Sequence, residues 1–184
     1  MSTTEPATWL GRLEDSFPGR RTEVVRGALV QERVRTFHRQ TLFHVGVALE
    51  SCPDARWGFV SDAVFPFDAD TEFCPDLAVV PRADAEANRL VHAPGSAGLI
   101  VEIASPGTRE RCHSLKPARY AGVGIPYYVV LDPYRATCVT YAQPGADGYR
   151  ARDTVPYGSV VALDSSVLGR VRIPTECLPV DSGA

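Results

Sequence analysis

The sequence LIVEIA, residues 99–104, is an apolar run that carries a single charge, Glu102. A second apolar run, Leu77–Val80, precedes it and is introduced by Pro75 and Asp76. Short apolar runs bounded by turn-forming residues are typical of interior strands that are covered on both faces. We therefore expect a sheet in which one central strand carries Glu102 and the neighbouring strand begins beside Asp76.

Helices and further strands are expected on both sides of these runs. Apolar residues recur at helical spacing over Thr36–Glu50, which predicts a helix there. The polar segment Ser105–Gly124 is helical by its position, and Pro117 either kinks that helix or begins a second one. The remaining expected strands are two within Glu23–Val34 about the turn at Arg26–Gly27, then Arg56–Val60, Ala63–Phe67, Ile125–Asp132, and a hairpin pair at Cys138–Ala142 and Tyr149–Val155.

The elements follow one another as helix, three strands, helix and strand, which indicates an α/β fold. An N-terminal β-hairpin precedes this core and an antiparallel extension follows it. The chain has 184 residues, of which 45% are hydrophobic and 22% charged, as in ordinary globular proteins. We expect one domain at residues 21–184. Residues 1–20 are expected to form a loose arm, in which Trp9, Leu10 and Leu13 define a candidate apolar helical face.

Composition limits the kinds of partner and compartment. The formal net charge of −3 does not by itself indicate a nucleic-acid partner. No apolar run approaches the roughly 20 residues of a membrane span, and the N-terminus lacks the pattern of a signal peptide. The five cysteines have neither zinc-ligand nor redox spacing. We therefore expect free thiols and a cytoplasmic protein with no membrane association.

Two carboxylates and one lysine are the first candidates for chemistry. Asp76 and Glu102 are expected at the ends of adjacent strands, where both can bind one hard divalent cation such as Mg²⁺. A metal ion held in this way polarises a phosphoryl oxygen and activates a water. Lys116 is the only lysine among the 19 basic residues. Because arginine is used at every other basic position, the lysine here indicates that this position requires a compact ammonium. The alternative is structural, because a strand carboxylate is often the ion-pair partner of an arginine.

Four segments together carry a resemblance to a known family. They are Pro75–Val80, Val101–Pro106, Lys116 with Tyr120–Ala121, and Gly124–Pro133. In this order they resemble the Uma-type restriction-endonuclease family of the PD-(D/E)XK nuclease-like superfamily. With Glu23 and His38 the resemblance spans about residues 20–165. It implies a restriction-endonuclease-like core of helix, three strands, helix and strand.

The resemblance also implies roles for individual residues. Asp76 matches the aspartate of the superfamily motif and Glu102 its second acid, which makes both metal ligands. The usual lysine position is Ala104 here, and the Uma-type pattern instead takes its lysine from the following helix, at Lys116. The family has an aspartate four residues before that lysine, where this chain has Cys112. Supporting positions are Glu23 and His38.

The function implied is a metal-dependent endonuclease that hydrolyses phosphodiester bonds, with Mg²⁺ or Mn²⁺ as cofactor, DNA as substrate and a homodimer as the assembly. Three arginines flank Lys116 and form either a phosphate-binding strip or a solvated helix face: Arg109, Arg111 and Arg119. The alternative function is a catalytically inactive nuclease-like domain that acts as a binding or scaffold protein, which Cys112 and the acidic net charge favour. We expect Cys112 and Lys116 to lie on one helix face, with neither contributing apolar bulk to the core.

Overall fold

A mixed six-stranded sheet runs through the centre of the computed structural model, which describes residues 8–10, 21–32, 34–51 and 54–182. Its two inner strands that carry the candidate acids are β6 (Leu77–Pro81) and β7 (Leu99–Ile103), paired antiparallel. Strand β8 (Tyr127–Asp132) runs parallel to β7. The order is completed by β9 (Thr137–Gly145) and β10 (Gly148–Pro156) beyond β8, and by β3 (Trp57–Val60) beside β6.

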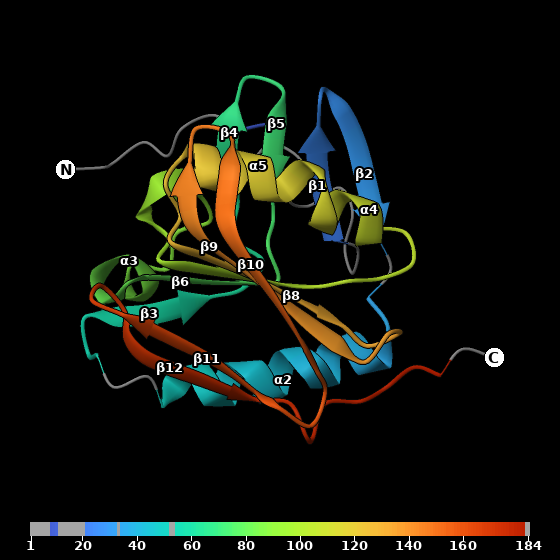
Figure 1. Ribbon diagram of the computed structural model, residues 1–184. Coiled ribbons are helices and arrows are strands. Elements are labelled where there is room, and N and C mark those ends of the chain that lie inside the picture. The colour runs from blue at the N-terminus through green and yellow to red at the C-terminus, as the bar shows by residue number, and fades with distance from the viewer. Residues whose placement is uncertain (1–7, 11–20, 33, 52–53, 183–184) are drawn as a thin grey trace.

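Both faces of this sheet are covered, as the apolar runs predicted (Figure 1). On one face lie α2 (Thr36–Glu50) and the hairpin of β11 (Val160–Ser165) and β12 (Gly169–Pro174). On the other face lie α4 (Arg109–His113) and α5 (Leu115–Gly122).

The alternation of side chains along β7 decides which face receives Glu102. Val101 and Ile103 pack in the core beneath α2, whereas Ile100 and Ala104 pack in the core beneath α5. Successive side chains of a strand point to opposite faces. Glu102 therefore points toward α5, the helix that carries Lys116.

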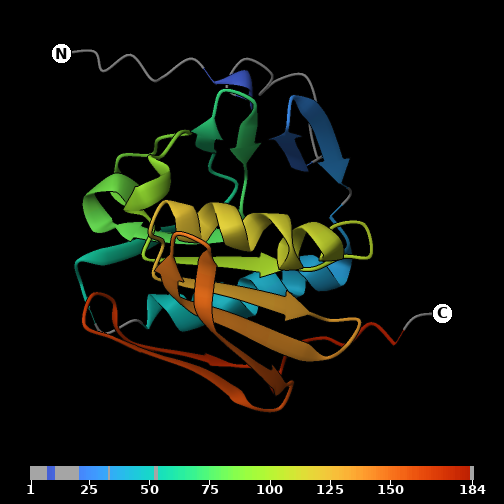
Figure 2. The same ribbon diagram turned by 45° about the horizontal axis from the view of Figure 1, so that its top comes forward.

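A second sheet of four strands lies on the same side as α5 (Figure 2). Its order is β2 (Ala28–Glu32), β1 (Arg21–Val25), β5 (Thr71–Phe73) and β4 (Phe65–Asp68). The chain passes from β5 to β6 through residues 74–76, so Asp76 lies where the two sheets meet. Two short helical segments, α3 (Arg82–Glu86) and η2 (Pro94–Ser96), lie between β6 and β7 in the sequence.

The predicted α/β order is confirmed, with several additions. The β11–β12 hairpin was not predicted, although Val161, Leu163, Val171 and Ile173 alternate with exposed residues in the pattern of half-buried strands. Strand β5 and helix α3 were not predicted either, because both are short. Among the described residues no helix is long and apolar enough to span a membrane.

The helical segment after β7 is broken before its proline. Helix α4 ends at His113, and α5 begins at Leu115, so that Pro117 lies in the first turn of α5. A proline is tolerated in the first turn because the amide it lacks would have no partner within the helix. Pro117 therefore belongs to a second helix, one of the two alternatives that the sequence left open.

The predicted arm is docked at the three residues that the structure describes. The backbone amides of Trp9 and Leu10 donate to the carboxylate of Glu72 on β5, at 2.7 and 2.9 Å. Leu10 and Thr8 are buried. At these three residues the backbone is held against β5, because Glu72 supplies a buried acceptor. The rest of the expected arm lies outside the described residues. Leu13 lies outside the described residues.

Candidate active site

Asp76 and Glu102 lie side by side at one edge of the β6–β7 pair. Leu77 is the register partner of Val101, so the antiparallel pairing places the residue before β6 beside Glu102 near the end of β7. Both carboxylates are almost completely buried. Buried carboxylates need partners that compensate their charge.

One guanidinium contacts both acids. Arg21, the first residue of β1, donates through Nη1 to Asp76 Oδ1 and through Nη2 to Glu102 Oε2, the latter at 3.0 Å. Its Nε and Nη2 also donate to the carbonyl oxygen of Cys74, with the Nε–O distance at 2.7 Å. A single guanidinium therefore bridges the two predicted metal ligands, with one of its terminal nitrogens on each.

Lys116 lies on the other oxygen of Glu102. Its Nζ is 2.5 Å from Glu102 Oε1 and 2.7 Å from Glu23 Oε1. The hydroxyl of Tyr120, one helical turn further along α5, donates to the same Glu102 oxygen at 3.0 Å. The ammonium also lies 5.3 Å from the centre of the Phe73 ring. Lys116 is only 1% exposed, so α5 presents it to the protein interior.

His38 completes the group around Asp76. Its Nε2 lies 2.5 Å from Asp76 Oδ1, and the backbone amide of Ile103 donates to Asp76 Oδ2 at 2.7 Å. Because His38 lies in the first turn of α2, the helix beneath the sheet contributes to the same site. We call these six residues the buried charge cluster: Arg21, Glu23, His38, Asp76, Glu102 and Lys116.

The cluster holds three carboxylates against the two permanent cations Arg21 and Lys116. Burial opposes the ionisation of Asp76, but the Arg21 guanidinium and His38 outweigh it and hold the pKa of Asp76 well below its usual range. Burial raises the pKa of Glu102, helped by the neighbouring acids, despite Lys116 and Arg21. The two neighbouring carboxyl groups therefore have pKa values shifted in opposite directions.

Lys116 and Glu23 also shift each other's pKa within the cluster. Burial works against the ammonium, but Glu102 and Glu23 prevail and raise the pKa of Lys116. Burial also opposes the charge of Glu23, yet Lys116 and Arg21 lower the pKa of Glu23. Lys116 is therefore a cation at neutral pH rather than a general base.

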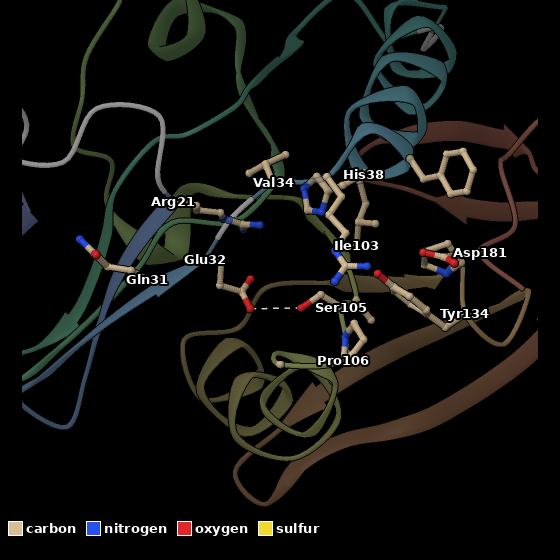
Figure 3. A pocket seen from close by; sticks show the side chains of 15 residues that line it. Arg21, Gln31, Glu32, Val34, His38, Ile103, Ser105, Pro106, Tyr134 and Asp181 are labelled. Carbon is tan, nitrogen blue, oxygen red and sulfur yellow. Dashed lines mark hydrogen bonds between the residues drawn. The ribbon is translucent and has the colours of Figure 1, made fainter. Parts of the chain in front are cut away.

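A cleft of about 290 Å³ reaches the cluster from solvent (Figure 3). Arg21 and His38 line this cleft, whereas Asp76, Glu102 and Lys116 lie behind them. Ala104, at the usual superfamily lysine position, lines it as well, and Ser105 donates to Glu32 across it at 3.1 Å. The other lining residues include Arg35, Pro106, Tyr134 and Asp181. The cleft is therefore the route by which a ligand would approach the acids.

The donor set of the cluster suits a hard divalent cation. Among the described residues no three His, Cys, Asp or Glu side chains are arranged to bind a metal together. Mg²⁺ commonly binds through only one or two carboxylates and keeps several waters. Asp76 and Glu102 supply two such oxygens, and both already contact one cation, the Arg21 guanidinium. The residues present therefore fit a Mg²⁺ or Mn²⁺ ion held by this pair.

Cys112 is part of the apolar core, contrary to the expectation from the sequence. Its side chain is fully buried, and burial raises the pKa of its thiol to about 12. The break at Ser114 places Cys112 and Lys116 on different helices, so the expected continuous helix face is wrong. The side chain of Lys116 is also buried, although neither residue was expected to contribute to the core. The four described cysteines are free, as predicted, and Cys52 lies outside the described residues.

The three arginines near Lys116 pair with acids of three different strands. Arg109 donates to Asp132 of β8 at 2.8 Å, and Arg119 donates to Asp68 of β4 at 2.6 Å. Arg111 lies 3.8 Å from Glu32 of β2. The structure does not bring these arginines together in one strip, and a role of each in binding DNA stays a prediction.

A second cavity, of about 570 Å³, brings Arg109 together with two arginines that the sequence did not single out, Arg135 and Arg152. It lies between α4 and strands β8–β10 and is lined by Arg109, Arg135 and Arg152, with Glu110 and Asp132 as its acids. Pro106 lines both this cavity and the cleft, so the two adjoin. Burial and the charges of Arg152, Arg135 and Arg109 lower the pKa of His113 in its wall. We call this cavity the arginine groove.

The fold and the buried charge cluster define a protein of the restriction-endonuclease-like class. A family model described as Uma2, "Putative restriction endonuclease", matches residues 10–176, and the chain belongs to this family. The chain is also similar to a crystal structure described as a putative nuclease belonging to DUF820 from Anabaena variabilis. That similarity has a TM-score of 0.63 at 15% identity, over 78% of this chain and 81% of the other, and it concerns the fold. No curated protein matches the chain.

The low pKa of Asp76 predicts a particular pH dependence of stability. A carboxyl whose folded pKa is depressed stabilises the fold above its unfolded pKa of about 3.9, and the contribution is lost as the pH falls through the folded pKa. Asp76→Asn should therefore lower the free energy of unfolding by about 3 kcal/mol at about pH 5, because Arg21 loses a buried partner. The difference from wild type should shrink by about pH 3.

Urea unfolding at both pH values measures this difference. Asp153→Asn, an exposed carboxylate without an arginine or lysine partner among the described residues, is the control. Its stability should stay within about 0.5 kcal/mol of wild type. An Asp76→Asn difference that stays constant between the two pH values would contradict the charge balance described above.

Proposed function

We propose that this protein is a metal-dependent endonuclease that hydrolyses phosphodiester bonds, with DNA as its substrate. The observation that carries the proposal is the contact of Asp76 and Glu102 with a single cation, while Lys116 holds the other oxygen of Glu102. The membership of the chain in a restriction-endonuclease-like family supports it.

Asp76 and Glu102 would hold Mg²⁺ or Mn²⁺. When bound, such an ion polarises a phosphoryl oxygen and lowers the pKa of a bound water. Lys116 fixes the orientation of Glu102 and adds a permanent positive charge where negative charge develops on the phosphate. Glu23 holds the ammonium from the other side, and Tyr120 donates to Glu102, so that the carboxylate keeps one orientation.

The arginine groove is the place where we expect the flanking nucleic acid to lie. Arg135 has no carboxylate partner among the described residues, and Arg152 lies 5.7 Å from the Tyr141 ring centre. Exposed arginines of this kind bind phosphate oxygens. The groove continues from the cleft at Pro106, so a strand bound there leads toward the acids. The dimer expected from the sequence stays a prediction.

The second candidate function is an inactive nuclease-like domain that binds or scaffolds. Two observations favour it. Cys112 replaces the family's acid with a neutral thiol, and Arg21 occupies the oxygens that a metal ion would need. A protein of this kind would keep the fold and the groove but would not hydrolyse phosphodiesters.

The nuclease activity depends on the cluster and on a divalent metal. Supercoiled plasmid and single-stranded DNA should be cut with Mg²⁺ or Mn²⁺ and not in a chelator. Glu102→Gln and Lys116→Met should each lower the rate by roughly 100-fold or more, since positioning and acid–base effects are of that size. Glu72→Gln, a buried carboxylate that accepts from two backbone amides outside the cluster, is the matched control. Loss of activity in that control alone would argue against this site.

Substitutions at Cys112 distinguish the two candidate functions. Cys112→Asp should raise the cleavage rate, since the substitution restores the acid that the family has at this position, and the charge of Lys116 acts on position 112. Cys112→Asn has the same size without the charge and should not raise it. Because position 112 is fully buried, both variants should be less stable than wild type, which thermal unfolding measures. If the wild-type protein cleaves no DNA with either metal, and Cys112→Asp does not raise the cleavage rate, the binding or scaffold function is the one that remains.

Binding along the arginine groove should depend on salt. Removing one phosphate contact lowers the slope of log affinity against log salt by about one. Arg135→Gln and Arg152→Gln should each weaken binding of a DNA duplex in a chelator, where no cleavage occurs. Arg170→Gln, an arginine of β12 paired with Asp164 on the opposite face of the main sheet, should leave the slope unchanged. Equal effects of all three variants would exclude the groove as the binding track.

A further inference from the structure

Arg21 separates the cleft from the two carboxylates. Of the buried charge cluster, Arg21 and His38 line the cleft, and Asp76 and Glu102 do not. In Figure 3 the Arg21 side chain points into this region from the end of β1. Its side chain is only 7% exposed although it borders the cleft. A ligand that enters from solvent therefore meets Arg21 before it reaches the acids.

The guanidinium holds the oxygens that remain for a metal ion. Asp76 Oδ2 accepts the amide of Ile103, and Glu102 Oε1 accepts Lys116 and Tyr120. The two other oxygens, Asp76 Oδ1 and Glu102 Oε2, are those that Arg21 contacts, with His38 also on the former. A divalent ion shared by the pair would use these same two atoms.

We propose, on the basis of the proposed function, that Arg21 is an internal cation which occupies the metal position between Asp76 and Glu102 in the metal-free protein. Metal binding is then an exchange, in which the guanidinium leaves both oxygens and moves toward the cleft. Mg²⁺ binds oxygens at about 2.0–2.1 Å. A guanidinium that donates to the same two oxygens would lie against that ion, and the two positive charges repel each other.

An arginine suits this task for two chemical reasons. It stays protonated at every pH at which the protein is folded, so the two acids are compensated whenever the metal is absent. Its planar fork also donates from two separate nitrogens to two carboxylates in a fixed geometry, which the single nitrogen of a lysine ammonium does not provide. Arg21 is a positioning residue in this scheme: it acts on the site through Asp76 and Glu102.

The exchange lowers the affinity of the wild-type protein for metal. A ligand that binds only the fraction of molecules with a free site shows an apparent affinity reduced by that fraction. Removing Arg21 frees Glu102 Oε2, leaves His38 as the side-chain contact of Asp76 Oδ1, and leaves three carboxylates with Lys116 as their permanent cation in the cluster. The site then becomes more negative, which adds to the attraction for a divalent ion.

Calorimetric titration of the metal-free protein with Mn²⁺ tests the exchange. Arg21→Gln should bind Mn²⁺ on the order of tenfold more tightly than wild type, or more. Arg21→Lys should lie between them, because an ammonium keeps the positive charge but lacks the two-nitrogen fork that contacts Asp76 and Glu102 together. Arg170→Gln is the control, since it removes an arginine from another carboxylate, Asp164, outside both the cluster and the arginine groove. Its affinity should equal that of wild type.

Thermal unfolding supplies the second measurement. Without metal, Arg21→Gln should unfold at a lower temperature than wild type. Mn²⁺ should raise the unfolding temperature of Arg21→Gln by more than it raises that of wild type. If Arg21→Gln does not fold without metal, Arg21→Lys carries the same comparison. Adding Glu102→Gln to either variant should abolish the gain in affinity, which shows that the ion binds at this pair.

The possible failures are distinguishable. Equal or weaker Mn²⁺ binding by Arg21→Gln and Arg21→Lys, with wild-type binding that still requires Glu102, would overturn the exchange and leave the proposed function intact. Absence of Mn²⁺ binding in wild type and in both Arg21 variants would overturn the metal site itself, and with it the proposed nuclease activity. An equal gain in Arg170→Gln would show a general charge effect and would also overturn the role of Arg21.

Discussion

The compensation of three buried carboxylates is the constraint on which the arrangement of this protein depends. Asp76, Glu102 and Glu23 are all removed from water, and each needs positive charge or hydrogen-bond donors to stay ionised there. Arg21 and Lys116 supply that charge. Because β1 carries Arg21 and Glu23 and α5 carries Lys116, the small sheet and the helix must both dock against the edge of β6 and β7.

The same arrangement explains why the cluster is well ordered and yet close to solvent. Apolar packing of β7 and β8 covers the acids from below, and α5 covers them from above. The cleft leaves one approach, through Arg21 and His38. A site with one approach and an excess of carboxylates is suited to binding a cation and a phosphate from the same side. This combination is what a phosphodiesterase needs and what a purely structural ion-pair network does not require.

The inactive alternative depends on the same contacts. If Arg21 never leaves the two carboxylates, the cluster is a structural element that joins the two sheets, and the arginine groove is then the part that meets a partner. The two functions therefore differ in a single physical property, the ability of one guanidinium to give way to a divalent ion. The neutral thiol of Cys112 bears on the same property, because an acid there would add negative charge near Lys116.

Much of the site was predictable because its residues stand out from their surroundings. Glu102 is the charge within an apolar strand, Asp76 begins the neighbouring one, and Lys116 is the chain's single lysine. Arg21 and the groove arginines offered no such signal, since arginine is common along the chain. The fully buried position of Cys112 was also missed, because the polar segment around it gives no local sign of which side chain of α4 faces the core.

The sequence by itself determined most of the strands, the main helix and the presence of charged residues in the core, because these follow from local patterns of apolar and polar residues. Tertiary structure alone decided which charges meet. Arg21 and Glu102 are 81 residues apart, and Lys116 and Glu23 are 93 apart. Their pairing depends on sheet register, on the face to which each side chain points and on how α5 docks. No local pattern encodes these, since they emerge only when distant segments pack together.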